Sequence, residues 1–399
     1  MTDSLFTELQ DLNQSKGAGA AIDRLIETLT ERREYDQLFD ALLLKKRFEM
    51  ELPLVQPSSS NGIPDDRLDE FEQCYVDSAR RVGRLFLDDG KIPLAWVYMR
   101  YIREPEPVRE ALEQLDPRNI DEESTEELLS VALYEGAHPV KGLEIMLRVN
   151  GTCNTITALD QQIHQMEPDD RRKSAALLVR ELYDDLCGTV RQDVEQRSGI
   201  RENSAVEQAE FSRIPLRTDS LRELIAGRDW LFEDGNYHVD VSHLNAVVRF
   251  ARFLTADDPE LDKAIQLTEY GGRLAPQFQY PADPPFDDFY PAHRWYFRVL
   301  AGDERDEGLR YFRDKIDEEP DDDDKPMIAY VLVDLLLRID RPKDALEVAA
   351  DYLQDVEDPN AFSFAKLCEQ AGRLDTLRET AIDHDDPVMF AAAMIQGGK

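Results

Sequence analysis

The sequence predicts an all-α protein, and two observations support this prediction. Apolar residues recur at steps of three or four along almost every segment, as in Ile22, Leu25, Ile26 and Leu29, which is the spacing of one face of an α-helix. Strand patterns, in which β-branched and aromatic residues alternate with polar ones, are nearly absent, and 238–241 is the one short candidate. We therefore expect a fold made almost wholly of helices.

The helical segments fall into blocks separated by clusters of proline, glycine and polar residues. The apolar groups 22–29 and 38–43 flank a charged stretch at 31–34, which predicts a helical hairpin. The stretch 169–196 lacks proline and repeats apolar residues at helical steps, which predicts one long amphipathic helix. In chain order, we expect an N-terminal hairpin over 1–52, a linker over 53–67, a hairpin unit over 68–109, an irregular helical middle over 110–275, a loop rich in proline and aromatic residues over 276–291, and a C-terminal array of hairpins over 292–399.

Composition narrows the class of protein and of its partners. With 42% hydrophobic and 33% charged residues, the chain is too apolar for a disordered protein and too charged for a membrane protein. Its 47 Lys and Arg residues against 83 Asp and Glu give a formal net charge of −36, which repels nucleic acid and anionic lipid, so neither is expected as a partner. The four cysteines form no Cys-x-x-Cys pair, and no apolar segment of about 18 residues occurs, so we expect a cytoplasmic protein.

A repeated pattern of small and large residues indicates a more specific architecture. In the unit 68–109, its positions are Ala79, Val82, Gly83, Phe86, Gly90, Ala95, Met99 and Pro107. Further units follow near the C-terminus, where the equivalent positions Tyr296, Val333 and Cys368 are 37 and 35 residues apart. Small residues such as Gly83 and Ala95 suit the point at which the two helices of a hairpin cross closely.

This pattern resembles the tetratricopeptide repeat, a helical hairpin of about 34 residues that stacks into an α-solenoid. The resemblance covers 76–109 and 289–393, with a weaker hairpin at 19–52. Only the unit at Trp295 has the aromatic residue with which the family motif begins, and 120–275 fits the motif poorly. The resemblance implies stacked antiparallel hairpins that bind a peptide or partner protein on a concave helical surface.

The charge of one segment suggests where such a partner binds. Residues 78–103 include six Lys and Arg against two Asp, which reverses the sign of the whole chain. If this unit follows the family register, Arg80 and Arg84 point into the groove one helical turn apart, and guanidinium groups hold carboxylates bidentately. We expect a protein or peptide partner to be bound by Arg80, Arg84, Arg100, Arg103 and His293. The alternative is that these arginines pair with the chain's own acidic residues.

A second hypothesis is a metal-dependent enzyme on a helical scaffold. His238, Asp240 and His243 place two imidazoles and a carboxylate within six residues, with His293 as a distant third imidazole, and such groups ligate divalent metals. Asp240 equally suits the N-cap of a helix that begins near Val241. The sequence has no Gly-rich phosphate loop and no Gly-x-Ser-x-Gly motif, so we expect no cofactor other than this divalent metal, and we assign no catalytic residue.

Overall fold

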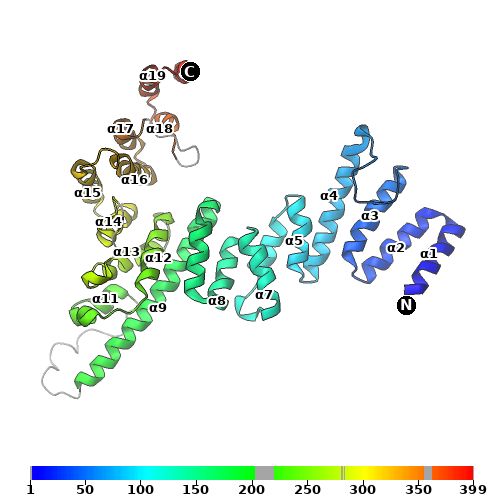
Figure 1. Cartoon of the computed structure of the whole chain (residues 1–399), viewed down its shortest axis with the longest axis horizontal. Helices are drawn as coiled ribbons and strands as arrows, with labels where there is room; N and C mark the ends of the chain where they lie inside the picture. The colour runs from blue at the N-terminus through cyan, green and yellow to red at the C-terminus, as the bar shows by residue number, and fades with distance from the viewer. Residues whose placement is uncertain (1, 203–219, 280–281, 283, 355–361, 399) are drawn as a thin grey trace. The chain divides into compact units, whose positions relative to one another are not determined.

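The computed structural model describes residues 2–202, 220–279, 282, 284–354 and 362–398, and over these the protein is all-α, as the sequence predicts (Figure 1). These residues form 19 α-helices, with short 3-10 or π segments between some of them, and no β-strand. The strand candidate 238–241 leads into a helix instead. The chain separates into two compact units, Met1–Thr155 and Ile156–Lys399, which are described in turn.

In the first unit, each of the first five helices packs against the next one along the chain, which is compatible with a helical repeat. Glycine interrupts the last of them: Gly151 has a φ of +78°, which lies outside the helical region and suits a residue without a Cβ atom. The helices are α1 (Thr2–Lys16), α2 (Ala18–Glu31), α3 (Tyr35–Glu49), α4 (Asp65–Asp88), α5 (Ile92–Tyr101), α6 (Glu106–Glu113), α7 (Glu122–Leu129) and α8 (Pro139–Gln162), and the boundary between the units falls within α8.

The crossing of α4 and α5 depends on small residues. A Cβ atom added to Gly83 would lie 2.8 Å from Cε of Met99, which is closer than carbon atoms approach without displacement. Ala95 on α5 and Phe86 on α4 are buried as well. Gly83, which the repeat pattern predicts at the crossing, therefore does allow α4 and α5 to approach closely.

The same short turn connects several pairs of consecutive helices. After α4, Gly90 has a φ of +74°, its N–H donates to the carbonyl of Leu87, and the N–H of Lys91 donates to the carbonyl of Phe86. This pattern is a Schellman motif, which satisfies the last carbonyls of a helix and turns the chain sharply. Equivalent turns, each with a residue at φ between +52° and +69°, lie at Arg33, Arg103, Asp340, Gly372 and Asp385.

A buried arginine orders the loop between α3 and α4. Arg47 has its side chain buried, and its guanidinium donates to the carbonyl oxygens of Pro53 (2.7 Å), Pro57 (3.0 Å), Ser59 and Asn61 (3.2 Å). These bonds replace the water that the guanidinium loses on burial and satisfy loop carbonyls that no helix pairs. The expected linker region is thus fastened to α3 by one side chain.

The second unit begins with an arrangement unlike a row of hairpins. Its long helix α9 (Pro168–Glu202) includes the stretch 169–196 and packs against α11 (Leu221–Ile225), α12 (Val241–Phe250) and α13 (Glu260–Gly271). The hydroxyl of Tyr183 in α9 donates to Oε1 of Gln266 (2.9 Å) and accepts from the N–H of Leu221 (2.9 Å), so it joins three of these helices. One long helix covered by shorter ones accounts for the poor fit of this section to the repeat pattern.

The remaining helices again pack in chain order, each against the next. Gly308 allows a close approach in the first of these pairs, because a Cβ atom there would lie 2.3 Å from Cγ2 of Val299. The helices are α14 (Phe289–Ala301), α15 (Arg305–Glu318), α16 (Lys325–Arg338), α17 (Pro342–Tyr352), α18 (Phe364–Gln370), α19 (Leu374–Asp383) and α20 (Pro387–Gly397).

Candidate binding surface

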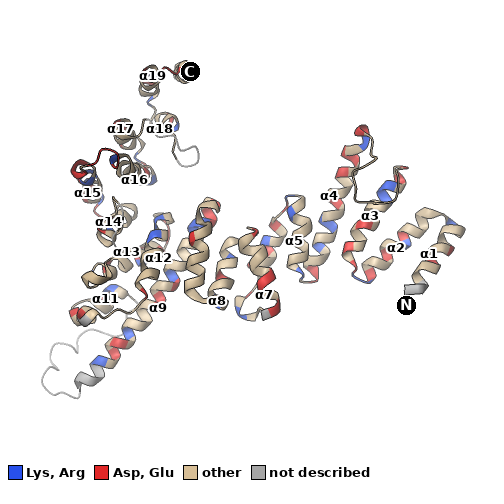
Figure 2. Cartoon of the chain, in the orientation of Figure 1, with Lys and Arg blue, Asp and Glu red and all other residues tan. Residues whose placement is uncertain are grey.

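The basic residues of the segment 78–103 lie on α4, on α5 and in the turns beside α5 (Figure 2), and they differ in whether an acidic residue pairs with them. Arg80 is held by the chain's own acids: its Nε and Nη2 donate to the two carboxylate oxygens of Glu104 at 2.8 and 2.6 Å, and its Nη1 donates to Asp77 at 2.6 Å. Arg100 likewise pairs with Glu135. These two guanidinium groups are therefore already neutralised within the molecule.

Arg84 and Arg103 are exposed, and in the part of the chain that the structure describes neither has an ion-pair partner within 4.0 Å. Arg103 lies in the turn that follows α5, where its backbone φ of +59° is fixed by the Schellman motif. Lys91, in the turn that precedes α5, is also exposed and has no ion-pair partner among the described residues. The helix α5 is thus flanked at both ends by a cation that remains available to a partner.

Between these two cations, α5 presents an apolar stripe to the solvent. Leu94, Val97 and Tyr101 are 43%, 57% and 71% exposed. Their spacing of three and four residues places them on one line along the helix. Single exposed apolar residues are common, but three aligned on one helix face form a patch of the kind that mediates protein contacts. We call these three residues the α5 stripe.

The opposite face and the flanks hold α5 firmly in place. Ile92, Ala95 and Met99 are buried on the core side. On the flanks, the indole Nε1 of Trp96 donates to Glu135 at 2.9 Å, and the hydroxyl of Tyr98 donates to Asp36 at 2.7 Å. Burial and the Asp36 carboxylate raise the pKa of Tyr98, so this hydroxyl stays protonated and keeps its bond. The stripe is therefore presented by a rigid helix, which lowers the entropic cost of binding.

The residues of the metal hypothesis have other partners. Both ring nitrogens of His238 are engaged, Nε2 with Oδ2 of Asp193 at 2.9 Å and Nδ1 with the hydroxyl of Tyr270 at 3.0 Å. Asp240 is the N-cap of α12, where its carboxylate accepts from the N–H and the hydroxyl of Ser242. His243 lies in the first turn of that helix and is half-buried. Among the described residues, no group of three or more His, Cys, Asp and Glu side chains is arranged to hold a metal ion.

His293, which the sequence analysis assigns both to the partner-binding residues and to the metal hypothesis, is a buried residue of α14. Its Nδ1–H donates to the carbonyl of Phe289 at 2.7 Å, while its Nε2 is buried without a hydrogen-bond partner. The ring stacks on Phe286, with 4.1 Å between ring centroids. Burial lowers the pKa of His293 to about 3, so the ring is neutral at pH 7. In this position it contacts other core side chains and not a surface.

No family model, curated protein or solved structure matches the chain. The structure shows how the helices pack, but membership of the tetratricopeptide family stays a hypothesis. In the described residues, no helix is both long enough and apolar enough to cross a membrane.

The sequence analysis does not predict the α5 stripe, although the sequence contains a signal for it. The segment from Ile92 to Tyr101 is apolar at nearly every position, whereas a helix with one buried face needs only about half of its positions apolar. An excess of apolar residues on a short helix indicates either complete burial or a second contact surface. The structure shows that the outer face is exposed.

Proposed function

We propose that this protein binds another protein through the outward face of α5, and that its helices form a scaffold of stacked hairpins of the tetratricopeptide kind. The observation that carries this proposal is the α5 stripe, Leu94, Val97 and Tyr101, which is apolar, exposed and held on a rigid helix. A surface of this kind gains affinity from burying apolar area on a partner. The high net negative charge supports a protein partner in the cytoplasm over nucleic acid or a membrane.

The residues around the α5 stripe indicate which side chains the partner segment should carry. Lys91 and Arg103 lie at the two ends of α5, and both are exposed. A partner segment with apolar side chains at its centre and carboxylates toward its ends would bury the stripe and pair with both cations. Because most of this chain's surface is acidic, such a segment would be repelled elsewhere, which favours binding at this place.

Photo-crosslinking from the stripe tests the proposal. A benzophenone amino acid at position 97 is expected to give one reproducible adduct with a partner protein in cells, since this side chain is 57% exposed at the centre of the stripe. The same amino acid at position 388, which is 78% exposed on α20, serves as the matched control and should not give that adduct. Identical adducts from both positions, or none from position 97, would contradict the proposal.

Two substitutions separate the roles of the stripe and of the cations. Tyr101→Asp introduces a charge into the stripe at an exposed position, so it should remove the adduct. Because the Tyr101 ring also lies 5.3 Å from the ring of Tyr75, the variant should lose about 1 kcal/mol of stability and still fold. Arg103→Ala should weaken the complex about tenfold at low salt and make its affinity less dependent on ionic strength. An Arg103→Ala complex with wild-type affinity and salt dependence would restrict recognition to the apolar residues.

A further inference from the structure

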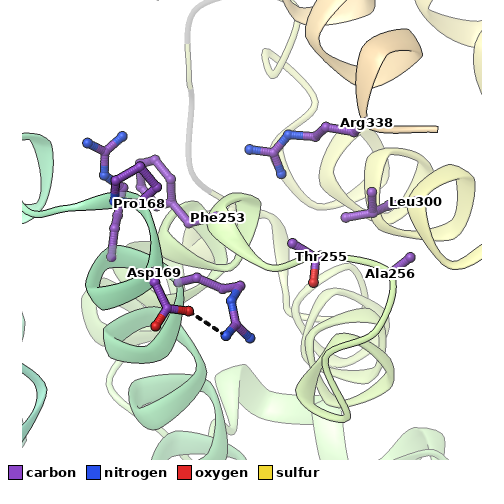
Figure 3. A pocket seen from close by; sticks show the side chains of 9 residues that line it. Pro168, Asp169, Phe253, Thr255, Ala256, Leu300 and Arg338 are labelled. Carbon is purple, nitrogen blue, oxygen red and sulfur yellow. Dashed lines mark hydrogen bonds and ion pairs between the residues drawn. The ribbon is translucent and has the colours of Figure 1, made fainter. Parts of the chain in front are cut away.

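A cavity of about 530 Å³ lies in the second unit, where the start of α9, the end of α14, the end of α16 and the segment after α12 meet (Figure 3). Phe253, Ala256 and Leu300 contribute apolar side chains to its wall. Its charged lining residues are Arg171, Arg172 and Arg338, together with Asp169, which pairs with Arg172. The volume is in the range of small-molecule sites, which combine apolar walls with a few placed polar groups. The nature of these polar groups indicates the kind of ligand.

Arg338 is fixed in position but keeps donors available. Its Nη1 donates to the carbonyl oxygens of Arg252 (2.6 Å) and Leu254 (3.1 Å), and its Nε lies 3.0 Å from Oδ2 of Asp334. Its Nη2 has no hydrogen bond to any described residue. In Figure 3, the Arg338 side chain extends from the end of α16 into the space between the elements. A guanidinium held in this way has lost most of its side-chain entropy before a ligand arrives.

Arg171 has a charge that no carboxylate neutralises within the described part of the chain. Its Nη2 donates to the carbonyl of Met166 at 3.0 Å, and its guanidinium lies over the ring of Phe253, 5.2 Å from the centroid. Its Nε is buried without a hydrogen-bond partner. Arg172, by contrast, is paired with both Asp169 and Asp258. An unneutralised and partly unsatisfied guanidinium beside a cavity favours an anion in that cavity.

We propose that this cavity binds a small organic anion, in which a carboxylate or phosphate group accepts from Nη2 of Arg338, an apolar body lies against Phe253 and Leu300, and Arg171 adds an unneutralised positive charge to the wall. The N–H donors of a guanidinium can bind either a carboxylate or a phosphate, because both groups present a pair of anionic oxygen atoms. This site is independent of the α5 stripe, which lies in the other unit.

Calorimetric titration of the full chain with three probes tests the proposal. The probes are benzoate, phenyl phosphate and the neutral benzyl alcohol, all at one ionic strength. At least one of the two anions should bind with a Kd on the order of 1 mM, as expected for ligands of this size, and benzyl alcohol should bind at least about tenfold more weakly. The stronger of the two anions identifies the acidic group for which the cavity is suited.

Three variants connect that binding to the cavity. Arg338→Gln should weaken anion binding about tenfold, because it removes one charge-assisted contact. Ala256→Phe fills the wall from an exposed position and should abolish binding with the arginines intact, so it serves if Arg338→Gln does not fold. Arg341→Gln is the matched control, because Arg341 pairs with Asp344 and does not line the cavity.

Three results would overturn the proposal. The first is the absence of saturable binding of either anion up to about 10 mM, which is about ten times the expected Kd. The second is equal binding of benzyl alcohol, which would show that charge is irrelevant. The third is a folded Ala256→Phe variant that binds as tightly as the wild type, or an Arg341→Gln variant weakened as much as Arg338→Gln, since either would place the binding outside the cavity.

Discussion

The buried imidazole of His293 predicts a specific loss of stability in mild acid. In the folded protein its Nε2 has no partner and burial lowers its pKa to about 3, whereas in the unfolded chain the pKa is about 6.5. Between these two values the unfolded chain binds a proton that the folded protein does not. Proton binding by the unfolded chain lowers the free energy of unfolding. The protein therefore has its full stability above pH 6.5 and loses part of it progressively as the pH falls toward 3.

The size of the effect follows from these pKa values. Stability changes by about 1.4 kcal/mol per pH unit once the pH is well below that of the unfolded imidazole. At pH 7 the unfolded imidazole is mostly neutral, and at pH 5 it is almost fully protonated while His293 in the folded state is still neutral. Integrating between these two points gives a loss of about 2 kcal/mol.

Urea unfolding of the wild type and of His293→Leu at pH 7 and pH 5 measures this loss. Leucine is close to histidine in size and cannot titrate, so the stability of the wild type relative to the variant should fall by about 2 kcal/mol between the two pH values. Phe297→Leu, in the same buried helix, is the control: it should cost about 1 kcal/mol at both pH values. A difference between wild type and His293→Leu that is the same at both pH values would refute the reasoning.

Three further predictions concern backbone and loop positions. Gly188→Ala should raise the free energy of unfolding by about 1 kcal/mol, because this helical position has open space around it. Gly308→Ala should lower the free energy of unfolding, because the new Cβ would lie 2.3 Å from a side-chain carbon of α14. Thermal melting should therefore shift upward for the first variant and downward for the second. Asp340→Gly should stabilise by about 0.5–1 kcal/mol in urea unfolding, since residue 340 has a φ of +59°, and an unchanged or lower midpoint would contradict this. Arg47→Met should speed proteolysis and amide exchange in 53–61 without affecting other loops, because it removes the donors that hold those carbonyls.

The helices were predictable because periodicity is a local property of the sequence. Gly83 could be assigned to a helix crossing because only small residues fit where two backbones approach closely, and it does lie against Met99 of α5. Ala95, predicted at the same crossing, is fully buried. The long helix α9 likewise needed only an uninterrupted pattern with no proline.

The candidate sites were harder to predict because their partners are distant in sequence. Arg80 is neutralised by Glu104, 24 residues later, only because the turn after α5 brings that carboxylate back to α4. His238 meets Asp193, 45 residues earlier, through the packing of α12 on α9. Neither pairing corresponds to a fixed sequence spacing that could be recognised in advance. Charge and residue type alone therefore could not distinguish side chains that are paired within the protein from those available to a partner.

The Schellman turns also constrain how this protein can change over time. Each one connects two helices through only three or four residues, so the connection is too short to absorb an inserted or deleted residue. Losing one residue from the end of α4 would rotate α5 by about 100° about the axis of α4 and move Met99 away from Gly83. Length variation should therefore accumulate by gain or loss of whole helix pairs, or in the longer segments such as 53–64, and seldom by single residues at these turns.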